Sequence, residues 1–229
     1  MQILGFIPAR KGSKGIKGKN LIKFNKKPLI LSTIKFSKKL KFVTPFVSTD
    51  SKKILNYALN EKIKFNYLRP KNLSTDKSNV IDAVMHVIKW FEKQNIYFDA
   101  VMMLQPTTPV RKLAEVNKII KIFKKNKKKS VIIVTKMKEH PYECIKIYRK
   151  NWDFIEKNYK KKIRRQDYPQ NYYFIDGSVY LASINFIKKN KSFVVKGKTI
   201  LFKSSQYPGI DIDDYNDIKI AELFVNKSK

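Results

Sequence analysis

Cysteine is nearly absent from this sequence. Cys144 is the only one among 229 residues, so the chain cannot form an internal disulfide. Free thiols are typical of proteins in a reducing compartment, and we therefore expect a cytoplasmic protein. A lone cysteine also gives little support for a catalytic thiol, so the chemistry must come from other side chains.

Acidic residues are scarce as well. Asp and Glu number 18 against 50 Lys and Arg, which gives a formal net charge of +32. Such a charge is typical of proteins that bind nucleic acids or anionic membranes. Here, however, the lysines are spread over nearly every segment, and no nucleic-acid-binding motif occurs. We therefore expect neither partner, and we interpret most of the charge as a lysine-rich surface that attracts polyanionic ligands.

Long hydrophobic runs are also missing. No apolar run reaches the roughly 18 residues that span a bilayer, and the segment from Ile3 to Ile7 lacks the features of a signal peptide. We interpret that segment as a buried strand. The apolar content of 43% nevertheless exceeds that of disordered chains, so we expect one folded domain over residues 1–229.

Glycine is rare but concentrated at one place. Four of the seven glycines lie in the first twenty residues, and the segment that starts at Ile7 reads IPARKGSKGIKGKN. Glycines and cations after a strand favour a loop that receives phosphate. The spacing matches neither the P-loop, in which Gly-Lys precedes Ser or Thr, nor the GxGxxG dinucleotide motif. A flexible, lysine-rich surface loop is the alternative.

Apolar segments alternate with amphipathic ones along most of the chain. The expected strands are 3–7, 42–50, 64–70, 99–104, 130–137, 177–183 and 199–204, and the expected helices are 27–41, 52–62, 79–94, 114–125 and 214–225. Strands that alternate with helices form parallel sheets through right-handed crossovers. We therefore predict an α/β fold of the Rossmann-like, doubly wound type with a mostly parallel sheet. The pattern does not determine the strand order.

Residues 138–176 break this alternation. The segment is rich in aromatic and charged residues and shows no clean strand or helix pattern. Because Tyr, Trp, Phe and Arg are typical of interfaces, we interpret it as a small projecting element that serves as a dimer contact or as a lid. A long hairpin packed on its own sheet is the alternative.

Polar residues follow three of the expected strands. The first strand leads into the glycine-rich loop with Arg10 and Lys19, the second ends in residues 48–50 (STD), and the central one ends in residues 105–107 (QPT). In an open parallel sheet, ligands bind outside the carboxyl ends of the strands. We therefore expect the three segments to meet in one crevice that holds a polyphosphate and a polar second substrate.

Two carboxylates stand close together near the C-terminus. Asp211 and Asp213 are separated by one residue, so in an extended segment both side chains project from the same face. Two oxygen ligands together with substrate phosphates suit Mg²⁺, and we predict a magnesium site at this pair. The alternative is a helix start, in which Asp213 or Asp214 caps the first turn.

Arg164, Arg165 and Gln166 form a further candidate site. A guanidinium can bind a carboxylate through two parallel hydrogen bonds, which would suit an acidic substrate. Surface charge explains the same residues equally well. The residues alone therefore leave both interpretations open.

An ordered set of short motifs connects these observations. The segments IPARKGSKGIKGKN, VSTD, LRP, LQPTTPVR, HPY, RRQDYP, DGSVY and IDID, in this order, resemble the acylneuraminate cytidylyltransferase family, the CMP-sialic acid synthetases. The resemblance extends over about residues 3 to 225. It implies a Rossmann-like domain with a small dimerisation element, and a homodimeric enzyme. Such an enzyme couples CTP to an acidic nine-carbon sugar with Mg²⁺ and releases pyrophosphate.

The resemblance also implies roles for individual residues. Those implied to bind the nucleotide are Arg10, Gly12, Ser13, Lys14, Lys19, Asn20 and Arg69. Those implied to bind the sugar are Gln105, Arg165, Gln166 and Tyr180. Asp211 and Asp213 match the metal pair, and with Arg10 and Lys19 they are the candidate catalytic residues. The anomeric hydroxyl of the sugar is expected to attack the α-phosphorus of CTP.

The sequence departs from the family pattern at three places. Lys11 stands where the family usually has glycine, and Val80 where it often has serine or threonine. Residues 171–177 read NYYFIDG, where enzymes for sialic acid commonly have an arginine and an Asn-Gly pair. We expect N-acetylneuraminate or a close relative as the sugar, with legionaminic, pseudaminic and other sugar acids as alternatives. The more distant alternative for the function is a basic nucleic-acid-binding protein.

Overall fold

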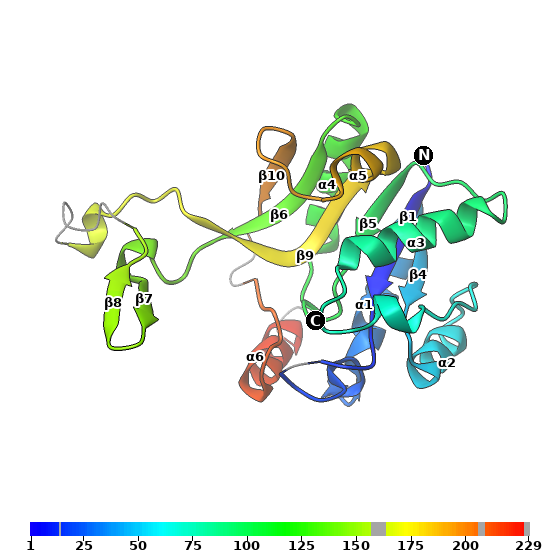
Figure 1. Cartoon of the computed structure of the whole chain (residues 1–229), viewed down its shortest axis with the longest axis horizontal. Coiled ribbons are helices and arrows are strands. Elements are labelled where there is room, and N and C mark those ends of the chain that lie inside the picture. The colour runs from blue at the N-terminus through cyan, green and yellow to red at the C-terminus, as the bar shows by residue number, and fades with distance from the viewer. Residues whose placement is uncertain (14, 157–163, 206–208, 227–229) are drawn as a thin grey trace.

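The main sheet of the protein has six strands in the order β10-β6-β9-β5-β1-β4. The computed structural model (Figure 1) describes residues 1–13, 15–156, 164–205 and 209–226. Neighbouring strands are parallel except for β9, which runs antiparallel to both β5 and β6. The strands are β1 (Ile3–Pro8), β4 (Val43–Ser48), β5 (Ala100–Met103), β6 (Ser130–Lys136), β9 (Tyr173–Ser183) and β10 (Thr199–Lys203). The predicted α/β fold with a mostly parallel sheet is therefore confirmed.

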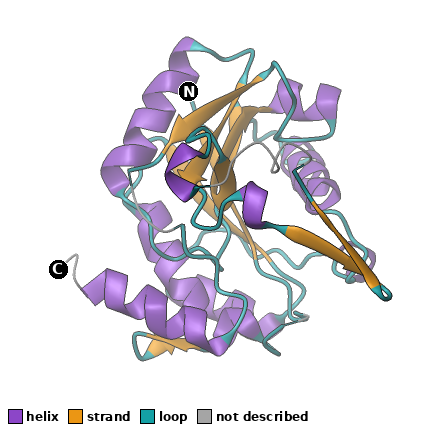
Figure 2. Cartoon of the chain, turned by 90° about the vertical axis from the view of Figure 1, so that its left-hand side faces the viewer, coloured by secondary structure: helices purple, strands orange, loops and turns teal. Residues whose placement is uncertain are grey.

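Helices cover both faces of this sheet (Figure 2). One face packs against α1 (Leu29–Lys38), α2 (Lys52–Asn60) and α4 (Leu113–Lys125), and the other against α3 (Val80–Glu92) and α5 (Ile184–Asn190). In β1, Ile3 and Ile7 belong to the first of these cores, whereas Leu4 and Phe6 belong to the second. Because both faces of the strand are buried, its sequence is a continuous apolar run.

The glycine-rich loop and the C-terminal segment pack against each other. The loop leads into η1 (Lys19–Leu21) and a small hairpin of β2 (Lys23–Phe24) and β3 (Lys27–Pro28), and the chain ends in α6 (Tyr215–Asn226). Ile16, Phe24, Ile212 and Ala221 lie in a third apolar cluster that joins these elements. Residues from opposite ends of the sequence are thus held side by side.

The segment between β6 and β9 leaves the body of the protein (Figure 1), and residues 137–172 are called the projecting arm below. It contains η3 (Pro141–Glu143), the hairpin β7 (Ile145–Tyr148) and β8 (Asn151–Phe154), and η5 (Arg165–Asp167). The hairpin forms its own two-stranded sheet, and on it Ile147 is 71% exposed and Trp152 is 56% exposed. The arm is shorter than the expected excursion because β9 already begins at Tyr173.

Some local expectations were wrong. The strand expected at 64–70 is reduced to a single bridge between Thr49 and Leu68, because Arg69 turns back to bond Ser48 and the chain then enters η2 (Lys71–Leu73). Helix α5 was not expected, although Ser183 caps it by accepting a hydrogen bond from the Phe186 amide. A helix of seven residues is too short to show a clear apolar period.

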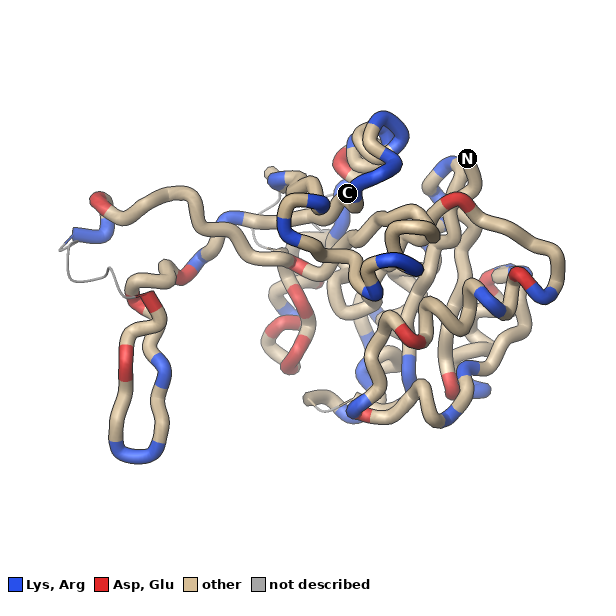
Figure 3. The backbone as a smooth tube through the Cα atoms, turned by 45° about the horizontal axis from the view of Figure 1, so that its top comes forward, with Lys and Arg blue, Asp and Glu red and all other residues tan. Residues whose placement is uncertain are grey.

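The surface is basic over most of the molecule. Figure 3 shows Lys and Arg on the body and on the arm, without a single face that gathers them. In the described ranges, none of the helices has the length and apolar character needed to cross a membrane. This distribution fits the interpretation of the charge as a lysine-rich surface.

Candidate active site

A cleft of about 360 Å³ opens beyond the carboxyl ends of β1, β4 and β5. The sequence-predicted residues that line it are Arg10, Gly12, Ser13, Lys19, Asn20, Arg69, Gln105 and Asp213. Lys14 lies outside the described residues. Two of the three strand ends that we expected to meet line this cleft, those after β1 and β5, whereas residues 48–50 do not. β4 contributes indirectly, because its last residue, Ser48, bonds Arg69.

The glycine-rich loop is fixed from within and from the C-terminal segment. The Ser13 hydroxyl donates to the Ile16 carbonyl and accepts a hydrogen bond from the Lys19 amide at 3.2 Å. The buried Lys19 ammonium donates to the Ile212 carbonyl at 2.7 Å and to Asp213 Oδ1 at 2.8 Å. A Cβ at Gly15 would lie 2.7 Å from the Asp213 carbonyl oxygen, so only glycine allows this approach. Ser13 thus shapes the loop, and Lys19 fastens it.

The Arg10 guanidinium forms an ion pair that an anionic ligand can replace. Its Nη1 lies 2.6 Å from Oδ1 of Asp76, a carboxylate that is itself well exposed. Ion pairs of this kind contribute little to stability, about 0–1 kcal/mol. The Arg10 carbonyl accepts a hydrogen bond from Asn20 Nδ2 at 2.9 Å, which keeps the backbone in place. The Arg10 guanidinium can therefore exchange Asp76 for an anionic ligand at little cost.

Arg69 forms part of the wall opposite the loop. Its Nε donates to Ser48 Oγ at 2.9 Å and its Nη2 donates to the Ser48 carbonyl at 2.5 Å. Burial lowers the pKa of Arg69 from its ordinary value. A buried guanidinium with two fixed bonds has few conformations left to lose when a ligand binds. Val80, at the start of α3, lines the same cleft.

The two aspartates differ in their surroundings, and together they fit a divalent cation. Asp211 Oδ1 is buried and has no hydrogen-bond partner among the described residues. Burial raises the pKa of Asp211, and a hydrogen bond with Thr107 opposes that shift. An orphaned buried carboxylate oxygen is unusual unless a ligand completes it. Asp213 is 80% exposed.

This donor set suits Mg²⁺ more than a metal that needs an all-protein cage. The described residues contain no group of three or more His, Cys, Asp or Glu that could hold a metal ion. Magnesium normally keeps waters and phosphate oxygens beside one or two carboxylates. Of the two alternatives for a helix cap, Asp214 is the one found, since its Oδ1 accepts hydrogen bonds from the Asn216 and Asp217 amides. Asp213 remains available to the cleft.

Gln105 lies against a bulge in β9. From Ile175 to Tyr180 the strand advances five residues, while β6 advances two, from Ile132 to Val134. Gly177 in this bulge has φ of +75°, and a Cβ there would lie 2.8 Å from Gln105 Oε1. Bulges of this kind often re-aim side chains beside functional sites. The Asp-Gly pair that departs from the family pattern is therefore next to the predicted sugar-binding glutamine.

Tyr180 lies next to the cleft and does not line it. Its ring packs 5.9 Å from that of Phe193, on the α3 side of the sheet. Burial raises the pKa of Tyr180, and the nearby carboxylates Asp176 and Asp211 raise it further. A role of Tyr180 toward a sugar stays a prediction.

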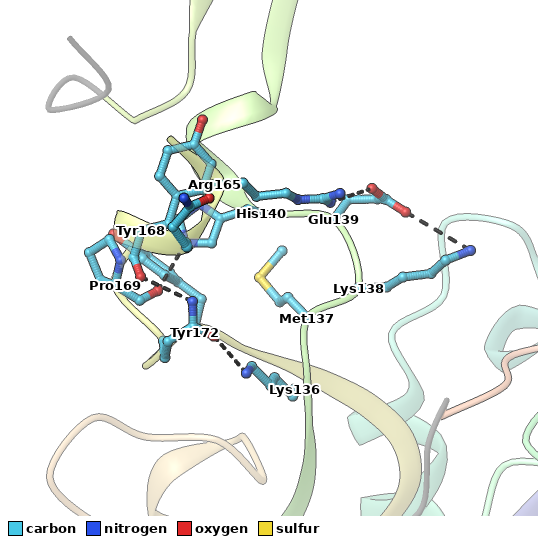
Figure 4. A pocket seen from close by; sticks show the side chains of 11 residues that line it. Lys136, Met137, Lys138, Glu139, His140, Arg165, Tyr168, Pro169 and Tyr172 are labelled. Atoms are coloured by element: carbon cyan, nitrogen blue, oxygen red, sulfur yellow. Dashed lines mark hydrogen bonds and ion pairs between the residues drawn. The ribbon is translucent and has the colours of Figure 1, made fainter. Parts of the chain in front are cut away.

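Arg165 and Gln166 line a different cavity, of about 600 Å³, in the projecting arm. Figure 4 shows Arg165 extended toward Glu139, beside His140 and Tyr168. The Arg165 Nη2 lies 3.7 Å from Glu139 Oε2 and 3.4 Å from Glu143 Oε2. These two predicted sugar-binding residues are thus not brought to the cleft of their own chain.

Two charged residues beside the cleft were missed by the sequence analysis. Asp176 is only 5% exposed, and its Oδ1 accepts hydrogen bonds from the amide and hydroxyl of Ser178. Arg111 makes four hydrogen bonds that connect three elements of the fold. The only signal for Arg111 was its place at the end of LQPTTPVR, directly after a buried strand.

Comparisons with known proteins agree with this site. A family model described as Cytidylyltransferase matches residues 4–227. The CMP-N,N'-diacetyllegionaminic acid synthase of Legionella pneumophila is 33% identical over 97% of this chain and 95% of that protein. The pseudaminic acid cytidylyltransferase of Campylobacter jejuni is 30% identical over 97% of this chain and 96% of that protein. A solved CMP:2-keto-3-deoxy-manno-octonic acid synthetase, complexed with CTP, covers 100% of both chains with a TM-score of 0.71 at 13% identity, which shows the same fold.

Proposed function

This chain belongs to the cytidylyltransferase family, as its motifs predicted, and we propose that it transfers the cytidylyl group of CTP to a nonulosonic acid. The products are the CMP-sugar and pyrophosphate. The observation that carries this proposal is the contact between the glycine-rich loop and the proposed metal pair. The Lys19 ammonium bonds Asp213, and both residues line the same cleft. Cations for a triphosphate and carboxylates for Mg²⁺ therefore share one site.

The proposed sugar is a nine-carbon acid of the legionaminic type. Two observations support this choice. The relative named for diacetyllegionaminic acid is 33% identical over nearly the whole chain, and Asp176-Gly177 stands where enzymes for sialic acid commonly have Asn-Gly. N-Acetylneuraminate and pseudaminic acid are the alternatives, and the second is supported by a relative that is 30% identical.

In the proposed reaction, the protein mainly positions the substrates and neutralises charge. The loop amides and Arg10 hold the phosphates, while Asn20 and Arg69 lie toward the nucleoside. The anomeric hydroxyl of the sugar attacks the α-phosphorus in line with the departing pyrophosphate. Arg10 and Lys19 stabilise the negative charge on the phosphate oxygens. Because the protein holds them in place beforehand, little reorganisation is needed to reach the transition state.

Asp211 and Asp213 are the proposed ligands of Mg²⁺, which supplies positive charge to the phosphate oxygens when bound. Thr107 holds Asp211 through a side-chain hydrogen bond, and the Thr107 carbonyl accepts the Ile212 amide at 2.8 Å. Lys19 holds Asp213 on the other side. Both carboxylates are thus oriented by the protein before a ligand arrives.

We propose that the protein works as a homodimer through the projecting arm. The arm exposes several large apolar side chains: Ile145, Ile147, Tyr148, Trp152 and Ile155. Exposed apolar groups in one place are typical of interfaces. In such a dimer, Arg165 and Gln166 would serve the sugar site of the partner chain, because they do not line the cleft of their own.

Mass spectrometry of the products tests the proposal. The purified protein is incubated with Mg²⁺, one of the four ribonucleoside triphosphates, and diacetyllegionaminic acid, pseudaminic acid, N-acetylneuraminate or an eight-carbon 3-deoxy sugar acid. We expect a CMP-sugar and pyrophosphate from CTP with a nine-carbon acid only. Turnover with another nucleotide, or with the eight-carbon acid alone, would refute the proposed substrates.

A further inference from the structure

The guanidinium of Arg111 joins three elements beneath the cleft. Its Nε donates to the Ser178 carbonyl in β9 at 2.9 Å, and its Nη1 donates to Thr33 Oγ1 in α1 at 3.1 Å. Its Nη2 donates to the Gln105 carbonyl at 2.5 Å and to Thr108 Oγ1 at 3.0 Å. A planar group with five donors in fixed directions can serve four acceptors at once, and lysine cannot.

Two of these bonds reach groups that form the sugar side of the site. The Gln105 side chain lies against Gly177, which precedes Ser178 in the bulge of β9. Arg111 therefore holds both partners of that contact, the turn after β5 through the Gln105 carbonyl and the bulge through the Ser178 carbonyl. A shift of either segment would separate Gln105 from the bulge.

The same turn extends to the proposed metal ligand. Thr107 lies between the two turn residues that Arg111 holds, and it bonds both the Asp211 side chain and the Ile212 amide. The positive charge of Arg111 also attracts the carboxylates of Asp176 and Asp211. Burial lowers the pKa of Arg111 to about 9, so the guanidinium is desolvated and its acceptors replace water.

The nucleotide side of the cleft is built without Arg111. Ser13 shapes the glycine-rich loop, Lys19 fastens it to Ile212 and Asp213, and Ser48 holds Arg69. None of these bonds involves the turn at 105–108 or the bulge. The loop and Arg69 are therefore held by hydrogen bonds other than those of Arg111, and the two halves meet at Ile212, whose amide bonds the Thr107 carbonyl.

We propose that Arg111 is a positioning residue for the sugar half of the site, which sets Gln105, the β9 bulge and Asp211 in place without lining the cleft itself. This inference rests on the proposed function. Loss of Arg111 is expected to raise the KM for the sugar acid and the Mg²⁺ concentration for half-maximal rate. At saturating Mg²⁺, the KM for CTP is expected to change little.

Two isosteric variants test this proposal with matched chemistry. Thr108→Val and Thr33→Val each remove one hydroxyl that bonds Arg111. Only Thr108 belongs to the turn, where its hydroxyl also donates to the Gln105 carbonyl at 3.2 Å. We expect Thr108→Val to raise the sugar KM about fivefold to tenfold, in the range of one lost hydrogen bond to a charged group. Thr33→Val should leave both KM values within about twofold of the wild type. Differences of that size are within the usual error of mutational free energies.

Arg111→Lys and Arg111→Met extend the series. The sugar KM should rise further in both variants, with Met above Lys, while the CTP KM stays nearly constant. Equal rises in both KM values, or a lower melting temperature with unchanged KM values, would show a merely structural role and overturn the inference. Should both Arg111 variants fail to fold, unchanged KM values in Thr108→Val would still overturn the inference.

Hydrogen exchange of the backbone amides separates failure of this inference from failure of the proposed function. It is measured by mass spectrometry on the free protein, so it requires no turnover. Residues 105–108 and 175–179 are expected to exchange faster in Thr108→Val than in Thr33→Val. Equal exchange in the two variants would refute the inference, whereas a wild type without turnover on any sugar acid would refute only the proposed function.

Discussion

The cleft and the cavity of the projecting arm hold their cations in opposite ways. In the cleft, Lys19 and Arg69 donate to backbone carbonyls, at 2.7 Å for Lys19 on Ile212 and 2.5 Å for Arg69 on Ser48. In the arm, the Arg165 side chain is 64% exposed and faces two exposed glutamates at 3.4 Å and 3.7 Å. Cations held by buried carbonyls are preorganised, whereas exposed ion pairs are weak and readily exchanged.

This difference suggests that the cleft and the arm serve different substrates. The cleft brings together, within one chain, the residues that we propose to bind a nucleotide and a metal ion. The arm carries exposed cations and exposed apolar side chains, and we propose that another chain covers them. Nucleotide recognition should therefore survive damage to the arm, and sugar recognition should not. The following predictions test that division, from the largest expected effect to the smallest.

Asp211→Asn should cause the largest loss. The substitution removes the charge of the one carboxylate that has an orphaned buried oxygen, so kcat at fixed Mg²⁺ is expected to fall about a hundredfold or more. Pyrophosphate release measured against Mg²⁺ concentration checks this. Asp214→Asn is the matched control, because it keeps the oxygen that caps α6. Full metal-dependent turnover by Asp211→Asn would refute the metal assignment.

Ile147→Lys combined with Trp152→Lys should dissociate the dimer. Burial of each large apolar side chain contributes about 1.5–3 kcal/mol, so the Kd of the dimer should rise about a hundredfold or more. Sedimentation equilibrium measures the Kd directly. Lys150→Ala, at the tip of the same hairpin, should leave it unchanged. A double variant that stays dimeric at wild-type affinity would place the interface elsewhere.

Arg165→Gln should affect only the second substrate. Removing one charge-assisted contact to a carboxylate is expected to raise the sugar KM about tenfold, with the KM for CTP unchanged. Steady-state kinetics with each substrate varied in turn provides the test. Arg164→Gln serves as control, since Arg164 pairs with its neighbour Asp167. A parallel rise in both KM values would argue against the division between cleft and arm.

Asp176→Asn should have the smallest effect on kcat. It creates the Asn-Gly pair that is common in enzymes for sialic acid, so it tests the preference among sugar acids, and it should also affect stability. Burial raises the pKa of Asp176, so the folded state favours the protonated carboxyl. The resulting stabilisation is complete below the unfolded pKa and is lost as pH rises through the folded pKa. An asparagine side chain does not titrate, so its contribution to stability does not fall as pH rises. The free energy of unfolding of the variant should therefore be higher at neutral pH, by on the order of 1 kcal/mol. Urea unfolding at several pH values tests this, and parallel curves would contradict it.

The sequence was most informative where a local rule determines the structure. The run from Ile3 to Ile7 predicted a buried strand, and the glycines after it favoured a loop that turns sharply or approaches a ligand closely. The loop does require glycine at residue 15, where the Asp213 carbonyl occupies the space of a side chain. The partner in that contact is 198 positions away in the chain, and no local pattern in the sequence indicates it.

Other features depend on tertiary contacts and were therefore not predicted. Gln105 lies beside Gly177 in the bulge of β9, and Gly209 packs against the Cβ of the buried Asp176. Arg165 was assigned to the sugar by resemblance alone, and the fold of a single chain separates it from Gln105. Residue identity indicated what these groups can bind, but their positions depend on partners distant in sequence.

The bond between Lys19 and the Ile212 carbonyl joins residues 193 positions apart, and this has a consequence for biosynthesis. A ribosome releases the glycine-rich loop first and the segment that fastens it 193 residues later. The nascent chain can pair β1 with β4 and β5 long before residue 212 emerges, but its loop then lacks the contact that holds Lys19. Closing so long a loop is entropically costly and slow. The proposed nucleotide site should therefore be completed only after residue 212 has emerged.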